Sequence, residues 1–201
     1  MDYALVEFSQ LDKDDIKRLA VLHYSVMHTL LSNLGLPMVL RYYQVARDDP
    51  AVVGLFAVTP SGNMLGWAIG SPHPDLINSR LRTPFAWFLL QMLRLTLTHP
   101  FVLWQLIASV FNLANRSYME SGAIELTYIG VASNQRGKGL GGELLNSFIE
   151  LSRSAGYRSI VLSVETDNQP AIALYENMGF KILQTFSEGR YKRHRMELAL
   201  T

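Results

Sequence analysis

A glycine-rich stretch between a strand pattern and a helix pattern constrains this chain more than any other feature. It reads Ile129-Gly130-Val131-Ala132-Ser133-Asn134-Gln135-Arg136-Gly137-Lys138-Gly139-Leu140-Gly141-Gly142. Residues 125–129 predict a strand, and apolar residues from Leu144 to Leu151 recur at helical spacing. Glycines let a ligand approach the backbone, and the unpaired N–H groups that begin a helix attract negative charge. With the cations Arg136 and Lys138, the stretch predicts a phosphate or pyrophosphate site.

Two common phosphate-binding loops do not fit this stretch. A Walker A loop needs four residues between its glycines and a hydroxyl residue after its lysine, but Gly130 is too distant and Gly139 follows Lys138. Gly137, Gly139 and Gly142 do match the dinucleotide pattern G-x-G-x-x-G. That fold needs several more strand–helix units after the pattern, whereas this chain ends at residue 201.

Two sequence blocks resemble a known family. Arg136-Gly137-Lys138-Gly139-Leu140-Gly141 resembles the [Q/R]-x-x-G-x-[G/A] signature of the GCN5-related N-acetyltransferases, the GNAT superfamily. Asn168-Gln169-Pro170-Ala171-Ile172-Ala173-Leu174-Tyr175-Glu176-Asn177-Met178-Gly179-Phe180 is similar to its N-x-x-A-x-x-x-Y-x-x-x-G-F block. The resemblance covers residues 123–186 most strongly. It implies an α/β (α+β) GNAT fold, in which helices flank a single mixed and mostly antiparallel sheet, and one domain over residues 1–201.

The resemblance also implies acetyl-CoA as the acyl donor. The residues implied to bind coenzyme A are Ile129, Val131, Arg136, Gly137, Lys138, Gly139, Gly141, Gly142 and Asn168. The Val131 N–H would bond the thioester oxygen, and Tyr175 would protonate the leaving thiolate, unless it is a core tyrosine. Glu125 matches the base of the histone-acetylating branch. In the branch that acetylates ribosomal proteins the corresponding base position is Ser163, a poor base.

Glu125 admits a second interpretation. A carboxylate on a buried strand is costly unless it is used or paired, so a structural hydrogen bond is the alternative to a general base. No residue pattern points to a metal. His23 and His28 lie five residues apart, which is off the three- or four-residue spacing of one helix face.

The rest of the chain predicts strands and helices in an order that suits this fold. We expect a strand over 3–8, a helix capped by Asp12 or Asp14 and continuing to Leu30, and a second helix from Pro37 to Asp48. Strands over 52–58 and 64–70 form a hairpin, because the residues between them are turn formers. After the second block, two antiparallel strands close the chain.

A helical insertion over about 76–118 is the unusual part. Its apolar runs, 85–97 and 101–114, are each shorter than the roughly 20 residues that span a membrane. Three interpretations of residues 84–115 stay open: an extra layer on the domain, a homodimer interface or lid over the acceptor site, and a helix pair on a membrane surface. The last is disfavoured because the polar faces lack basic residues.

Composition excludes several classes of function. The net charge of +1 argues against a general nucleic-acid binder. The absence of cysteine excludes a cysteine nucleophile and thiolate metal sites. The first residues are acidic rather than basic and apolar, so we expect a cytoplasmic protein.

These observations lead to one hypothesis and two alternatives. We expect an N-acetyltransferase that transfers an acetyl group from acetyl-CoA to a primary amine of a small molecule, by direct attack in a ternary complex. The first alternative acts on protein N-termini or lysines. The second is a non-catalytic sensor or interaction module that binds coenzyme A.

Overall fold

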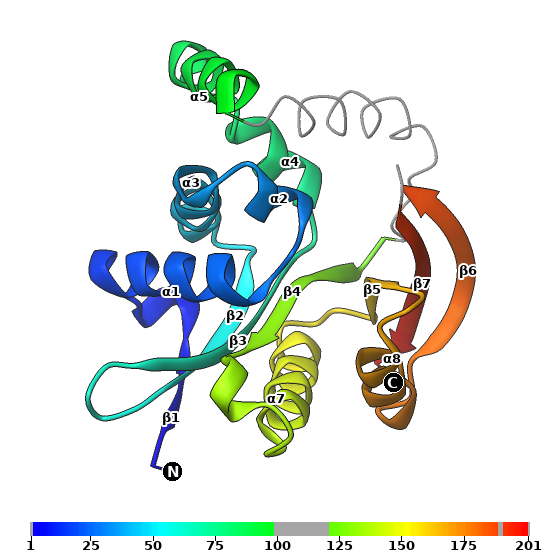
Figure 1. Cartoon of the computed structure of the whole chain (residues 1–201). Coiled ribbons are helices and arrows are strands. Elements are labelled where there is room, and N and C mark those ends of the chain that lie inside the picture. Colours follow the sequence, from blue (N-terminus) through cyan, green and yellow to red (C-terminus); the bar gives the residue numbers. More distant parts are fainter. Residues whose placement is uncertain (1, 99–120, 189–190, 201) are drawn as a thin grey trace.

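The computed structural model describes residues 2–98, 121–188 and 191–200, and its seven strands form one sheet (Figure 1). The strands are β1 (Ala4–Glu7), β2 (Val53–Val58), β3 (Met64–Ser71), β4 (Ala123–Val131), β5 (Ser159–Glu165), β6 (Lys181–Glu188) and β7 (Tyr191–Ala199). Their order across the sheet is β1-β2-β3-β4-β5-β7-β6. Only β4 and β5 pair in parallel, and every other neighbouring pair is antiparallel. The predicted mixed, mostly antiparallel sheet is therefore confirmed.

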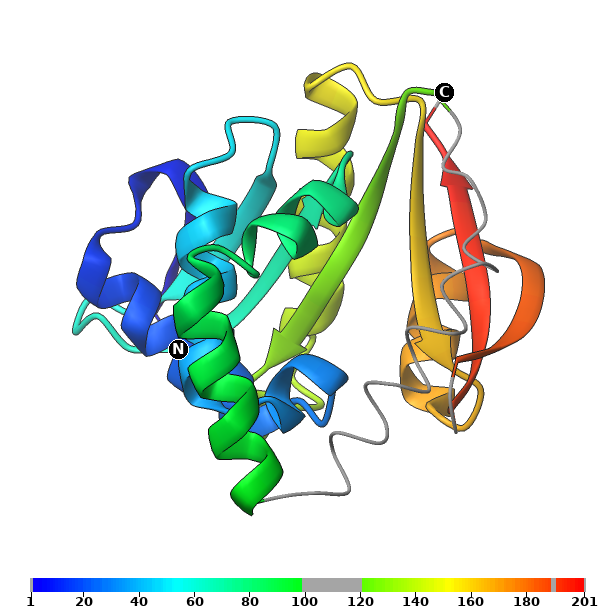
Figure 2. The ribbon, with the colours of Figure 1, turned by 90° about the horizontal axis from the view of Figure 1, so that it is seen from above.

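Helices cover both faces of the sheet (Figures 1 and 2). They are α1 (Lys13–Val26), α2 (Leu30–Asn33), α3 (Leu36–Arg47), α4 (Pro74–Arg80), α5 (Phe85–Thr98), α7 (Leu140–Ser154) and α8 (Gln169–Asn177), with short 3-10 turns at Phe8–Gln10 and Ser133–Gln135. One apolar core joins α1, α3 and α4 to one face of β2 and β3. The other joins α7 and α8 to the opposite face, across β2 to β5 and β7. The sheet, with β4 at its centre, thus lies between two separately packed layers of helices.

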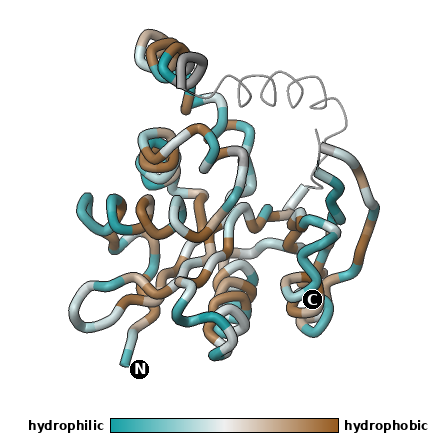
Figure 3. Tube along the Cα trace, in the orientation of Figure 1, coloured by the Kyte–Doolittle hydropathy of each residue, from teal (hydrophilic) through white to brown (hydrophobic). Residues whose placement is uncertain are grey.

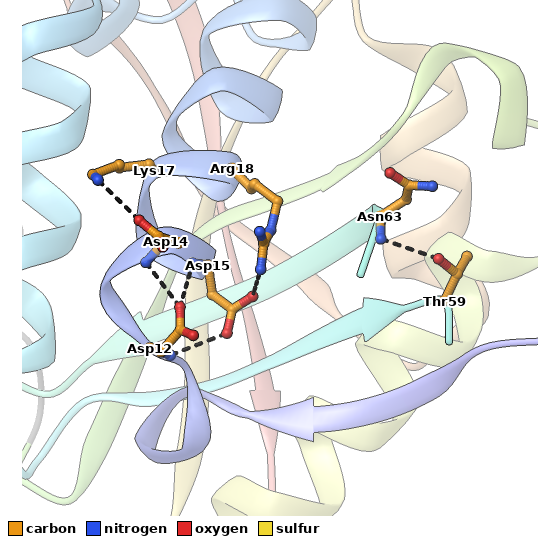
Figure 4. A network of polar contacts seen from close by, with 7 residues as sticks. All are labelled: Asp12, Asp14, Asp15, Lys17, Arg18, Thr59 and Asn63. Atoms are coloured by element: carbon orange, nitrogen blue, oxygen red, sulfur yellow. Dashed lines mark hydrogen bonds and ion pairs between the residues drawn. The ribbon is translucent and has the colours of Figure 1, made fainter. Parts of the chain in front are cut away.

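The beginning of α1 shows why this helix starts where it does (Figure 4). The Asp12 carboxylate accepts hydrogen bonds from the N–H groups of Asp14 and Asp15, at 2.8 and 2.7 Å. Asp15 in turn accepts from the Asp12 N–H at 3.0 Å, which completes a capping box. Nearby in the same view, the Asn63 N–H donates to Thr59 Oγ1 and closes the predicted hairpin turn. Of the two predicted caps, Asp12 is the one used.

The first helix is shorter than predicted. The apolar periodicity indicated one helix through Leu30, but α1 ends at Val26 and a separate turn of helix, α2, begins at Leu30. The break arises because Thr29 caps the second segment: its hydroxyl accepts a hydrogen bond from the Ser32 N–H at 3.3 Å. A threonine that caps a helix stands outside it, so the chain turns between the two segments. The prediction of a continuous helix was wrong.

The insertion between β3 and β4 begins with α4 and α5. It starts at Pro74, two residues before the predicted boundary, and the apolar run 101–114 lies outside the described residues. Helix α5 lies beyond α4 and carries many apolar residues (Figures 1 and 3). Its large side chains Phe85, Leu89, Leu90 and Leu93 are all more than half exposed. Among the described residues, no helix is both long and apolar enough to cross a membrane.

Candidate active site

The two central strands separate partway along their length. β4 and β5 pair over only three positions, and the last of these joins Glu125 to Val161. From that point the strands diverge, as Figure 2 shows from above. β4 nevertheless continues to Val131 and stays paired with β3 along its other edge. The divergence leaves the β5-facing backbone of β4 available to a ligand.

The register of β3 and β4 determines which backbone groups face this opening. The Ala132 N–H donates to the Leu65 carbonyl at 2.8 Å, so these two residues occupy a hydrogen-bonded position of the antiparallel ladder. Hydrogen-bonded and non-hydrogen-bonded positions alternate along such a ladder. The positions of Val131 and Ile129, opposite Gly66 and Ala68, are therefore non-hydrogen-bonded. Their N–H and C=O groups turn away from β3, toward the side on which β5 departs.

The glycine loop continues directly from this strand into α7. Gly137 and Gly139 have φ values of +74° and +86°, a region that favours glycine. A Cβ at either position would meet nothing within 4 Å, so the loop has free space beside its backbone. Gly139 caps α7 without a side-chain hydrogen bond. The first N–H groups of α7 thus lack a side-chain cap, as an anion site at a helix start requires.

The loop's two cations differ in their surroundings. Arg136 is exposed, and its Nη2 donates to the Val26 carbonyl at 3.4 Å, at the end of α1. Lys138 is exposed beside it. Arg136 therefore connects the glycine loop to the end of α1, whereas Lys138 remains solvent-exposed.

Helix α8 lies against the start of α7. A Cβ at Gly141 would be 3.7 Å from Val131 Cγ2 and 3.8 Å from Leu174 Cδ2, so the end of β4, the first turn of α7 and α8 meet there. Asn168 caps α8, because its side chain accepts a hydrogen bond from the Ala171 N–H at 3.3 Å. The two resembling blocks, distant in sequence, are therefore adjacent in space.

Tyr175 lies within α8, next to Leu174. It is buried against Phe180, with ring centroids 5.7 Å apart. Burial raises the pKa of Tyr175 to about 12, so its hydroxyl keeps its proton throughout the neutral range. The protonated form is the one that an acid requires, although the burial also agrees with a packing role.

Glu125 lies where β4 and β5 separate, and it has a charged partner. Arg195, from β7, donates from Nη2 to Glu125 Oε2 and from Nη1 to Ser163 Oγ, each at 3.1 Å. One guanidinium thus joins Glu125, the predicted base, to Ser163, the residue at the base position of the branch that acetylates ribosomal proteins. This pairing could not be predicted from the sequence, because Arg195 follows Glu125 by 70 residues and is one of two arginines on a charged strand.

An aromatic cluster lies on the same face of the sheet as Glu125, under α1 and α3. His23 Nδ1 and the Tyr43 hydroxyl are 2.7 Å apart, and the His23 ring contacts Trp67 and Tyr128. Tyr42 contacts Tyr128 edge to face. Burial lowers the pKa of His23 to about 4, so the imidazole is neutral near pH 7. His23 is therefore a buried histidine that packs among aromatic rings.

Comparisons with known proteins agree with this geometry. The chain matches the acetyltransferase (GNAT) family over residues 28–180. It is 39% identical to a mycothiol acetyltransferase of Corynebacterium glutamicum over 61 residues, which are 30% of this chain and 21% of that protein. It is 42% identical over 52 residues to an L-methionine sulfoximine/L-methionine sulfone acetyltransferase of Pseudomonas aeruginosa, covering 26% of this chain and 30% of that protein. The matched segment thus spans only about a fifth of the mycothiol enzyme and under a third of the other.

Solved structures share the fold over the whole chain. The ribosomal-protein-S18-alanine N-acetyltransferase of Escherichia coli has a TM-score of 0.63 at 16% identity, covering 100% of this chain and 95% of that one. The Salmonella typhimurium protein yncA, solved with its cofactor acetyl-CoA, has a TM-score of 0.62 at 16% identity, with 100% and 95% coverage. The predicted family is confirmed by the match over most of the chain. This protein belongs to the acetyltransferase (GNAT) family.

Proposed function

We propose that the chain transfers an acetyl group from acetyl-CoA to the primary amine of a small molecule. The observation that carries this proposal is the glycine loop, with an uncapped helix start and open space at Gly137 and Gly139, directly after a strand whose neighbour has departed. An anion fits at the helix start, and an extended pantetheine arm fits along the freed strand edge. The names of two relatives, the mycothiol acetyltransferase and the methionine sulfoximine acetyltransferase, support a small-molecule acceptor.

In the proposed reaction, a residue of this chain is assigned to each step. The N–H of Val131 would donate to the thioester oxygen and stabilise the charge that develops there. Glu125 would take the proton from the amine that attacks the carbonyl carbon. The Tyr175 hydroxyl would donate its proton to the sulfur as the carbon–sulfur bond breaks. Asn168, Lys138 and Arg136 would bind the remainder of coenzyme A.

The test is thiol release from acetyl-CoA with a panel of amino acids, amino sugars, polyamines and peptides. The chain has no cysteine, so the protein contributes no thiol background. Turnover with small amines and not with peptides is the expected result. Turnover with peptides alone would support the protein-acetylating alternative. Tight binding of coenzyme A without turnover would support a sensor instead.

Two substitutions with matched controls test the assigned residues. Glu125→Gln and Tyr175→Phe should each lower kcat by about 10²-fold or more, the usual contribution of a general acid or base. Glu150→Gln removes an exposed, ion-paired glutamate of α7 and should leave kcat unchanged. Tyr157→Phe is the control for Tyr175→Phe. It removes a hydroxyl that donates to the Ala51 carbonyl, remote from the loop. Equal losses in a variant and its control would reject that assignment.

A further inference from the structure

Arg195 joins three strands at the point where β4 and β5 separate. It lies on β7 opposite Ser163 of β5, and its guanidinium reaches Glu125 of β4, whose pairing with Val161 is the last between the two central strands. Its hydrogen bonds to Ser163 and Glu125 are each 3.1 Å long. One side chain thus connects the departing strand to the strand that stays.

The burial of this group makes its geometry exacting. Arg195 is only 8% exposed, and the Glu125 side chain is 23% exposed. Charges removed from water need their partners in good geometry, and a guanidinium presents its donors in a rigid plane. The bonds to Ser163 and Glu125 together restrain that plane, and the second of them holds one carboxylate oxygen of Glu125. The orientation of Glu125 is therefore set by a residue outside its own strand.

We propose that Arg195 is a positioning residue for Glu125: it holds Oε2, so that Oε1 is the oxygen that receives the proton of the acceptor amine. The inference depends on the proposed function for its catalytic part. Ser163 supports this arrangement because it accepts a hydrogen bond from Arg195 and so helps to hold the guanidinium in place. Because a displacement of about 1 Å can cost a hundredfold in rate, loss of the Ser163 hydroxyl or of the arginine should reach the chemical step.

The same strand supplies a matched control. Arg193 lies two residues before Arg195 and hence on the same face of β7, but it pairs with Glu165, at 3.7 Å, and not with Glu125. Replacing either arginine by glutamine removes a partly buried, ion-paired cation from the same face of β7. Only the Arg195 substitution removes the group that bonds Glu125.

The kinetic test uses Arg195→Gln, Ser163→Ala and Arg193→Gln, each with and without Glu125→Gln. Arg195→Gln should lower kcat about a hundredfold with the KM for acetyl-CoA unchanged, and Ser163→Ala should lower it less. In the Glu125→Gln background, Arg195→Gln should cause no further loss, because its effect passes through the carboxylate. A loss of the same size in both backgrounds, or an equal loss in Arg193→Gln, would overturn the inference.

A crystallographic test does not depend on turnover. In crystals of Arg195→Gln, or of Ser163→Ala if the former does not fold, the Glu125 carboxylate should leave the position that it occupies in the wild-type protein. A carboxylate that stays in place refutes the positioning role, whether or not the protein transfers acetyl groups. Absence of wild-type turnover with every amine would instead reject the proposed function, and the crystals would still decide whether Arg195 orients Glu125.

Discussion

Replacing Gly139 by alanine should weaken the binding of coenzyme A, whereas the same change at Gly156 should not. The two glycines border opposite ends of α7 and have nearly equal φ values, +86° and +83°. A Cβ at either would meet nothing within 4 Å. The two substitutions therefore impose the same kind of strain, which comes from the backbone and not from a clash.

The magnitude follows from that backbone strain. An alanine held at positive φ costs about 1–2 kcal/mol relative to glycine. At Gly156 the whole cost should appear as a lower free energy of unfolding. At Gly139 the exposed loop can relax in the free protein, and the strain returns when a ligand requires the loop's original shape. The Kd for coenzyme A should then rise about 5- to 30-fold.

Isothermal titration with coenzyme A measures the Kd, and urea unfolding of the free protein measures stability. Coenzyme A is preferred to acetyl-CoA because it cannot turn over. A Gly139→Ala protein that binds as tightly as the wild type would refute the assignment of this loop. A similar weakening in Gly156→Ala would show that any damage to α7 impairs binding, and it would refute the argument from the loop's geometry.

Three further predictions concern single residues. Because the unfolded chain protonates His23 near pH 6.5 and the folded protein only near pH 4, stability should fall as pH falls between these values, by about 2 kcal/mol from pH 7.5 to pH 5. Urea unfolding of His23→Gln should lack this part of the pH dependence, which the exposed His28→Gln should retain. Gly130→Ala would bring a Cβ to 2.5 Å from the Trp67 ring and should cost about 1–3 kcal/mol; an unchanged Tm would contradict that overpacking. Asn168→Ala should lower the unfolding free energy of the ligand-free protein by about 1 kcal/mol, because the cap of α8 is lost. An unchanged unfolding free energy would contradict the capping role of Asn168.

Some features of the site were predictable because their signals are local. Gly137 and Gly139 have positive φ values, which favour glycine, so the turn can be predicted from these residues without knowledge of the tertiary structure. The strand predicted over residues 125–129 is confirmed, and it extends in both directions as β4, Ala123–Val131. The break after α1 has a local signal too, the capping threonine Thr29, but the apolar spacing runs on past it and predicts a single helix.

The sequence by itself determined the family, the glycine loop and the order of the strands and helices. Turns, caps and periodic apolar faces depend on residues a few positions apart, so they can be predicted from the sequence. Only the tertiary structure decided that β4 and β5 part after Glu125, and that Arg195 bonds both Glu125 and Ser163 there. Strand register and ion pairing between distant residues depend on how whole faces pack. The sequence therefore does not distinguish the two arginines of β7, and only the fold places Arg195 beside the Glu125 carboxylate.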